Sequence, residues 1–318
     1  MGLVSEHIKW YNNKAVYKGG TKTFYKRKTM KAIKAILITL LVLVLIVVAA
    51  FFGTYFYVRS TYGIDLFRTA DQLKTLNERV DESTLCPNAY GDGDFVDMKD
   101  TVNAKLGGLI VYQDGKGYNG YYVDFQALAG KTLTGNVSLT EKQVGAIAQT
   151  VLFAQTGGKL KLGDKEVAVS IVQVDFSDCS DNGSADFNVV AKLDLSPFKA
   201  DMDGFPYKYV KKYIPDTLYV SSTVRVDKTD KNGFEYSVSH KSLTLNNLSS
   251  DDTADLFKTL DTILKIGSIE DLNVQIGTMA TNALIGNKDN VGFAYSMRAI
   301  GATTFDFVAA DADLFIVR

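Results

Sequence analysis

The longest apolar stretch of the chain runs from Ala35 to Val58 and contains no charged residue. As an α-helix, a stretch of this length spans the hydrocarbon core of a bilayer, which is about 30 Å thick. Tyr55 and Tyr57 lie where the aromatic belt of such a helix meets the outer interface. The pattern therefore predicts a transmembrane helix over residues 35–58.

Charge is distributed unevenly around this predicted helix. Residues 1–34 hold nine basic residues and one acidic residue, a net charge of +8, which leaves −9 for the rest of a chain whose total is −1. Because basic flanks stay inside, we expect a cytoplasmic tail near anionic lipid and an extracellular C-terminal part. The alternative is a cleaved secretory signal, but the apolar stretch exceeds the about 7–15 residues of a signal and no clear cleavage site follows.

Apolar residues spaced three and four apart predict four further helices. The first, over residues 64–80, is interpreted as a short amphipathic stalk, with a loop rich in Gly and Asp over residues 88–100. The second starts at Thr140, which forms a capping box with Gln143, and it ends at Gly157. The last two cover residues 250–266 and 268–286. The predicted parts of the chain are a tail (1–34), a transmembrane helix (35–58), a stalk and loop (59–100) and an extracellular domain (101–318).

Apolar runs bounded by turn residues predict strands. Residues 166–176 form one, and residues 187–195 form another, in which apolar and polar residues alternate except at Val190. Asn182–Gly183 between them predicts a two-residue turn. Hairpins are expected over residues 106–128 and 218–245, and further strands over residues 291–297 and 304–317. Antiparallel hairpins with amphipathic helices define an α+β fold.

Two apolar surfaces are larger than a thin sheet requires: one stripe of the helix that starts at Thr140, and one face of the strand over residues 187–195. The strand over residues 166–176 is apolar on both sides, with Val167, Val169 and Ile171 predicted to face one way and Val172, Val174 and Phe176 the other. We expect an apolar groove that accepts an acyl chain. The alternative is a sheet buried on both sides. The residues predicted to line the groove are Val144, Ile147, Val151, Phe187, Val189 and Leu193.

Residues that commonly carry catalysis are scarce in the sequence. His7 lies in the predicted tail, so a Ser-His-Asp triad outside the membrane would have to use His240. His240 shares one strand face with Tyr236 and Val238 and is interpreted as an ordinary strand residue. One histidine and two distant cysteines do not form a zinc site. We therefore predict no catalytic residue, no metal, no cofactor and no nucleic-acid partner.

Three other patterns have structural interpretations. Gly115, Gly117 and Gly120 match G-x-G-x-x-G, but a predicted strand follows them instead of a helix, so a hairpin loop is expected in place of a dinucleotide site. The acidic clusters over residues 92–100 and 175–181 lack the order of a calcium-binding loop and are expected to be solvated loops. The two cysteines, Cys86 and Cys179, either form one disulfide or remain free thiols.

The segment LTEKQ, from Leu139 to Gln143, opens a helix that long strands, a short Pro-ended helix and more strands follow. Over residues 137–264 this order resembles the YpmS-like membrane-anchored proteins of Gram-positive bacteria. That family is similar to the tubular lipid-binding (TULIP-like) folds, in which a curved sheet wraps a long helix around lipid. The resemblance implies a lipid-binding domain outside the membrane, and it assigns no functional residue.

These observations predict a non-enzymatic, single-pass envelope protein whose outer domain binds lipid or another apolar ligand near the membrane. The alternative is a structural or assembly component that docks on a partner protein or on a cell-wall polymer, which predicts an exposed apolar or aromatic patch in place of a closed groove. A hydrolase that uses acidic residues is a third hypothesis, and it requires two carboxylates that converge in a cleft.

Overall fold

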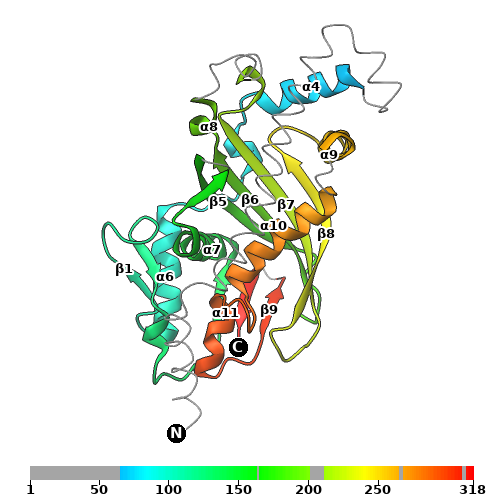
Figure 1. Ribbon diagram of the computed structural model, residues 1–318. Helices are drawn as coiled ribbons and strands as arrows, with labels where there is room; N and C mark the ends of the chain where they lie inside the picture. Colours follow the sequence, from blue (N-terminus) through cyan, green and yellow to red (C-terminus); the bar gives the residue numbers. More distant parts are fainter. Residues whose placement is uncertain (1–64, 163–164, 201–210, 265–267, 310–312) are drawn as a thin grey trace.

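The computed structural model describes residues 65–162, 165–200, 211–264, 268–309 and 313–318, and these form helices and three antiparallel sheets (Figure 1). The α+β prediction is confirmed. The largest sheet has the strand order β4-β5-β6-β7-β8, a second has the order β3-β10-β9, and a third pairs β1 with β2. The strands are β1 (Ile110–Tyr112), β2 (Tyr121–Val123), β3 (Val137–Thr140), β4 (Lys159–Leu162), β5 (Lys165–Ser177), β6 (Ala185–Asp194), β7 (Thr217–Lys228), β8 (Tyr236–Leu245), β9 (Phe305–Val308) and β10 (Leu314–Val317).

The helices are of very different lengths. The α-helices are α4 (Leu66–Asn77), α5 (Glu82–Leu85), α6 (Asp92–Leu106), α7 (Glu141–Thr156), α8 (Ser196–Ala200), α9 (Ser250–Leu264), α10 (Ile269–Leu284) and α11 (Phe293–Ser296). The short 3₁₀ helices are η2 (Phe125–Leu128), η4 (Lys211–Tyr213) and η5 (Met297–Ile300). None of the helices within the described ranges is both long and apolar enough to cross a membrane. The predicted transmembrane helix, residues 35–58, lies outside these ranges.

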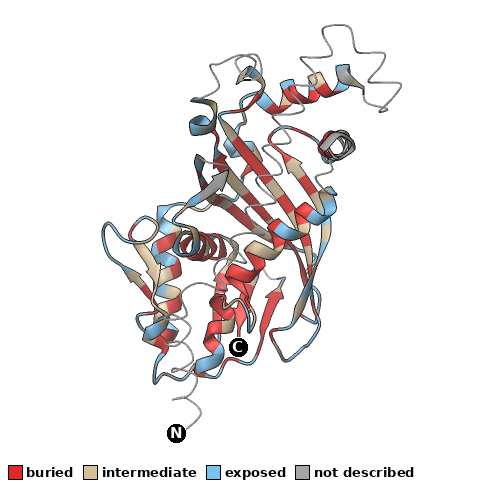
Figure 2. Cartoon of the chain, viewed as in Figure 1, coloured by how far each residue is buried: buried red, intermediate tan, exposed pale blue. Residues whose placement is uncertain are grey.

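Two long helices, α7 and α10, cover one face of the five-stranded sheet (Figure 1). α7 packs on β5, while α10 packs on β7 and β8 and also contacts α7. The predicted capping box of α7 is confirmed, because the Thr140 side chain accepts from the N–H of Gln143 and the Gln143 side chain accepts from the N–H of Thr140. Gly157, at φ 69°, ends the helix. The buried sides of both helices face the sheet (Figure 2).

A β-bulge just after Ile171 changes the predicted faces of β5. Ile171 lies opposite Ala191 and Val174 lies opposite Val189 on β6. Because Ala191 and Val189 are two positions apart, they share one face of β6, and so do their partners on β5. The prediction that Val174 and Phe176 face away from Ile171 is therefore wrong: all three side chains belong to one core.

The predicted loop over residues 88–100 is wrong from Asp92 onward, where α6 begins. The Asp94 carboxylate accepts from the N–H of Gly91 at 2.7 Å, and acidic residues in a first turn favour the positive end of a helix dipole. The buried stripe of α6 consists of Phe95, Met98, Val102 and Leu106. The helix continues to Leu106, so the predicted boundary between residues 100 and 101 falls inside it.

The C-terminal region also departs from the prediction. The expected strand over residues 291–297 is wrong, because α11 and η5 occupy this segment. The expected strand over residues 304–317 is two paired strands, β9 and β10. A cluster of buried rings joins this small sheet to the large one: Phe307 contacts Phe176 and Phe187 at centroid distances of 5.2 and 6.0 Å.

The connection between β5 and β6 is longer than predicted. β5 ends at Ser177 and β6 begins at Ala185, so residues 178–184 lie between the strands in place of a two-residue turn. Gly183, at φ 84°, leaves no room for a side chain, since a Cβ there would lie 2.3 Å from an Asp306 carboxylate oxygen. The loop thereby packs against β9. The predicted hairpin of β7 and β8 is confirmed.

Candidate functional site

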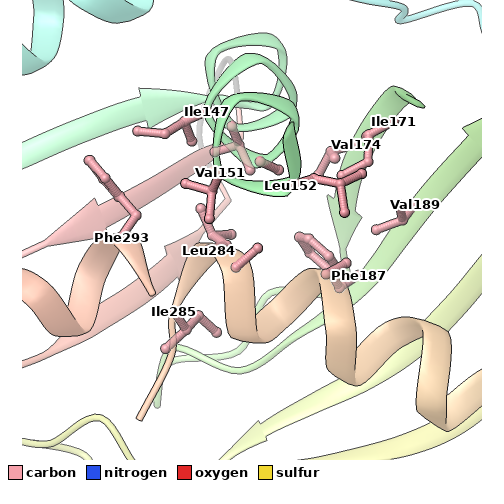
Figure 3. Close-up of a cluster of buried hydrophobic side chains, with 14 of the residues drawn as sticks. Ile147, Val151, Leu152, Ile171, Val174, Phe187, Val189, Leu284, Ile285 and Phe293 are labelled. Carbon is pink, nitrogen blue, oxygen red and sulfur yellow. The ribbon is translucent and has the colours of Figure 1, made fainter. Parts of the chain in front are cut away.

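The structure brings together the six side chains that were predicted to line an apolar groove. Val144, Ile147 and Val151 project from α7, and Phe187, Val189 and Leu193 project from β6 into the same cluster. The exposed fraction of each side chain is 4% or less. Figure 3 shows Val151 pointing from α7 toward Leu284 of α10, with Phe187 in the same cluster. The predicted residues are therefore neighbours, but they form packed core in this conformation.

α10 closes the interior and is fixed to the sheet by a buried polar side chain. The Asn273 amide donates to the Thr223 carbonyl oxygen at 2.7 Å, and its oxygen accepts from Ser222 Oγ at 2.6 Å. The same amide lies 2.8 Å from His240 Nδ1. One turn further along, a Cβ on Gly277 would lie 2.4 Å from Val224 Cγ1. A ligand that entered here would have to displace α10 and leave these buried groups without partners.

His240 has a structural partner in this arrangement. Its Nδ1 faces the Asn273 amide, and in the β-sheet His240 lies opposite Val224 of β7. The contact with Asn273 uses Nδ1 to seat α10, which supports the interpretation of His240 as a strand residue.

A second buried amide, which the sequence did not single out, supports the bulge of β5. Gln149 of α7 has no exposed surface, and its Oε1 accepts from the N–H of Ile171 at 2.7 Å. The Tyr90 hydroxyl donates to the carbonyl oxygen of Ile171. A bulge leaves backbone groups without ladder partners, and these two side chains supply them. In the sequence, the only sign of this role is that Gln149 is a polar residue on an otherwise apolar face of α7.

The segment between α4 and α6 crosses the outer face of the large sheet. Glu82 accepts from Lys192 Nζ at 3.0 Å and from the Tyr219 hydroxyl at 2.9 Å. Burial raises the pKa of Glu82, but these hydrogen bonds outweigh burial, so its pKa is lowered overall. Further along, Asn88 donates to an Asp175 carboxylate oxygen at 3.2 Å. The segment ties α4 firmly to the rest of the fold.

The two cysteines are free, so the possible disulfide is not formed. Cys86 packs with Val190 and Tyr219 on the outer face of the sheet, whereas Cys179 packs against the main core. Burial raises the pKa of each thiol to about 11. At neutral pH both remain protonated, a form that is a poor nucleophile and a poor metal ligand.

The acidic clusters serve structural roles. Asp92 and Asp94 lie in the first turn of α6, and Asp175 accepts from amide groups of Gln173 and Asn188. Within the ranges that the structure describes, no group of three or more His, Cys, Asp or Glu is placed to hold a metal ion. The expectation of a solvated loop is wrong for residues 92–100, which belong to α6, and for residues 175–177, which end β5.

The hairpin of β1 and β2 carries a cluster of tyrosines at the surface. The Tyr112 ring is 56% exposed and lies 5.0 Å from the Tyr121 ring, which stacks on buried Phe95 at 5.3 Å. Tyr118 contacts Phe95 and Phe153. We call Tyr112, Tyr118, Tyr121 and Tyr122 the tyrosine hairpin.

The three glycines of the G-x-G-x-x-G match shape this hairpin. All have positive φ, between 61° and 87°. A Cβ on Gly120 would lie 2.5 Å from the Tyr112 ring, and one on Gly117 would lie 1.9 Å from the Tyr121 carbonyl oxygen. The glycines thus allow the loop to pack under the rings, and β2 follows them. The predicted hairpin loop is confirmed.

Comparisons with protein-family models, with curated proteins and with solved structures find no match. The resemblance to the YpmS-like proteins and to the tubular lipid-binding folds therefore stays a prediction.

Proposed function

We propose that this chain is a non-enzymatic, single-pass envelope protein whose outer domain docks on a partner protein. The predicted anchor over residues 35–58, with its basic flank on the N-terminal side, supports a cytoplasmic N-terminus and an extracellular domain. The observation that carries docking is the tyrosine hairpin. It presents Tyr112, 56% exposed, on rings that are themselves seated on the buried Phe95.

Tyrosine suits a protein interface for physical reasons. Its ring contributes a large apolar area, its hydroxyl bonds at the edge, and it has few rotatable bonds to immobilise on binding. The ring contacts of Tyr121 with Tyr112 and Phe95 hold the cluster in place before any partner arrives. Preorganised aromatic side chains are typical of the residues that contribute most to binding.

Binding of lipid or another apolar ligand is the second candidate. It is favoured by the convergence of the α7 stripe with the apolar face of β6, and by two helices that cover one face of a sheet. It requires α10 to move, against the contacts of Asn273 and the close approach at Gly277. For this reason the exposed hairpin supports docking better than the closed interior supports ligand binding.

A photo-crosslinking experiment on the full-length chain separates these functions. A photoreactive amino acid replaces Tyr112 in one variant and exposed Lys241, on the edge strand β8, in a matched control. We expect one discrete protein adduct from position 112 and none from position 241. The purified partner should then bind the Tyr112→Ser chain at least about 10-fold more weakly than the unmodified chain, as for a residue that contributes strongly to an interface.

Other outcomes would contradict docking on a protein. An adduct with cell-wall fragments would assign the hairpin to a polymer. A lipid retained in native mass spectra of the full-length chain, and lost when Val151→Gln disrupts the interior, would favour the second candidate. Identical labelling from positions 112 and 241 would refute the role of the tyrosine hairpin.

A further inference from the structure

The end of the domain that carries α4 is tethered closest to the proposed anchor. The predicted transmembrane helix ends at Val58, and α4 begins at Leu66. A chain spans at most about 3.6 Å per residue, so the start of α4 lies within about 30 Å of the point where the chain leaves the membrane.

α4 is part of the folded body, so the same tether limits how far its neighbours can lie from the membrane. Leu73 and Leu76 are fully buried. Asn77 donates to the Lys212 carbonyl oxygen at 2.7 Å, which joins α4 to η4, and Gln72 donates to the Asp252 carbonyl oxygen at 3.2 Å, which joins it to α9. The helix that was predicted as an amphipathic stalk thus packs its apolar side on the folded domain. α4, α8 and α9 gather at one end of the molecule, and β1 lies at the other (Figure 1).

Some side chains at this end suit the interfacial layer of a bilayer, and they lie beside acidic ones on α9: Asp251 is exposed, and Asp252 and Asp255 pair with Arg68. Phe67 is 64% exposed, and Lys74, two turns along α4, is exposed on the same side. On the neighbouring η4, Lys212 Nζ lies 4.7 Å from the centre of the Tyr213 ring. Aromatic rings and lysines are enriched where proteins meet headgroups. Asp71, between Phe67 and Lys74, is also exposed, which fits a surface contact and opposes deep insertion.

We propose that this anchor end, defined by Phe67, Lys74, Lys212 and Tyr213, rests on the outer leaflet and binds its headgroup region. The inference rests on the proposed anchor. Its consequence is a fixed orientation, in which the tyrosine hairpin projects away from the bilayer. Contacts of lysines with anionic lipid would add to the tether and weaken as salt rises.

Fluorescence quenching in vesicles tests this orientation. Trp10 is the single tryptophan, so the full-length Trp10→Phe chain accepts one reporter, Phe67→Trp at the anchor end or Tyr112→Trp at the hairpin as a matched control. The chains are reconstituted in vesicles of phosphatidylcholine and phosphatidylglycerol that contain brominated lipid. We expect the Phe67→Trp reporter to be quenched at least about threefold more than the control, because bromine quenches only indoles in contact with the lipid. The added charge reversals Lys74→Glu and Lys212→Glu should reduce the difference.

An alkaline carbonate wash of the same vesicles reports the anchor separately. If the washed vesicles keep the chain and the two reporters are quenched equally, the proposed contact is refuted while the anchor stands. If carbonate releases the chain, both the anchor and this inference are overturned. Retention together with selective quenching at the anchor end supports the proposal.

Discussion

The buried ammonium group of Lys228 provides the sharpest test of how the two larger sheets are joined. Its side chain has no exposed surface, and its Nζ bonds Thr304 Oγ1 at 2.6 Å and an Asp306 carboxylate oxygen at 2.7 Å. Asp306 also pairs with Arg318. Lys228 ends β7 and Asp306 lies on β9, so the pair links the five-stranded sheet to the three-stranded one.

The structure predicts different effects for the two partners. Removing one member of a buried ion pair costs about 3–5 kcal/mol, because the other charge stays buried. In Lys228→Met, Asp306 still pairs with Arg318, so we expect the free energy of unfolding to fall by about 3 kcal/mol. In Asp306→Asn, the ammonium group of Lys228 loses its carboxylate inside the core, so we expect about 5 kcal/mol. The double variant should lose about 1–3 kcal/mol less than the sum, because its two sites interact directly.

Thermal unfolding of the full-length chain in detergent, followed by circular dichroism, measures these effects. In a domain of this size about 1 kcal/mol shifts the Tm by about 2–4 °C, so Lys228→Met should lower it by about 6–12 °C. The matched control is Lys231→Met, which replaces an exposed lysine in the adjacent turn. We expect this change to lower the free energy of unfolding by less than about 0.5 kcal/mol. Equal shifts for Lys228→Met and the control, or strictly additive effects in the double variant, would refute the reasoning.

Three further predictions follow from single side chains. Gly277→Ala places a Cβ 2.4 Å from Val224 Cγ1 and should destabilise the fold by about 1–3 kcal/mol in the same melts, whereas Gly93→Ala, with nothing within 4 Å, should be neutral or slightly stabilising. Because burial raises the pKa of Cys86 to about 11, iodoacetamide at about pH 8 should modify it about 100-fold more slowly than in urea, measured in a Cys179→Ser chain; equal rates would contradict its burial. The pKa of Glu82 is lowered overall, so its stabilising contribution is present above the unfolded value near 4.5 and is lost as pH falls through the lower folded value. In the Glu82→Gln chain, stability should therefore fall less between about pH 7 and pH 3 than in the unmodified chain. The difference should be less than about 1 kcal/mol, because the ion pair is partly exposed. An equal drop in Tm between these pH values for both chains would contradict the role of Glu82.

Local signals in the sequence predicted many elements correctly. Thr140 with Gln143 marked the start of α7, and Ser268, whose Oγ accepts from the N–H of Asp271, marked the start of α10. Caps of this kind act within one turn of chain, so a single sequence contains all the information they need. The β7–β8 hairpin is equally local, since its strands flank a short turn.

Other elements depended on information that a local pattern lacks. Gly93 and the aspartates around it suggested a loop, yet the apolar stripe from Phe95 to Leu106 packs on α7 and stabilises a helix there. Over residues 291–297, a short apolar run does not distinguish a strand from a helix. The bulge of β5 was also hidden, because a strict period of two assigns Val174 to the wrong face once one residue is inserted.

The candidate site shows the same division. The six predicted groove residues were identified correctly as apolar and as neighbours, because each shows the period of its own helix or strand. That α10 fills the space between them depends on which surfaces meet, and on residues such as Gly277 that permit close approach. Tyr112 was overlooked because its exposure is decided by the packing of the whole hairpin on Phe95.

The bulge also bears on function, because it decides how the apolar residues of β5 are used. By turning Val174 and Phe176 to the same side as Ile171, it directs the apolar side chains of β5 toward α7 and the core. The opposite face keeps Gln173 and Asp175, which hold the segment that leads from α4. One face of the sheet is therefore buried in the core, and the other face holds the segment that leads to the proposed anchor. The proposed recognition of a partner then falls to side chains that remain exposed, and the tyrosine hairpin, away from α4, presents Tyr112 for it.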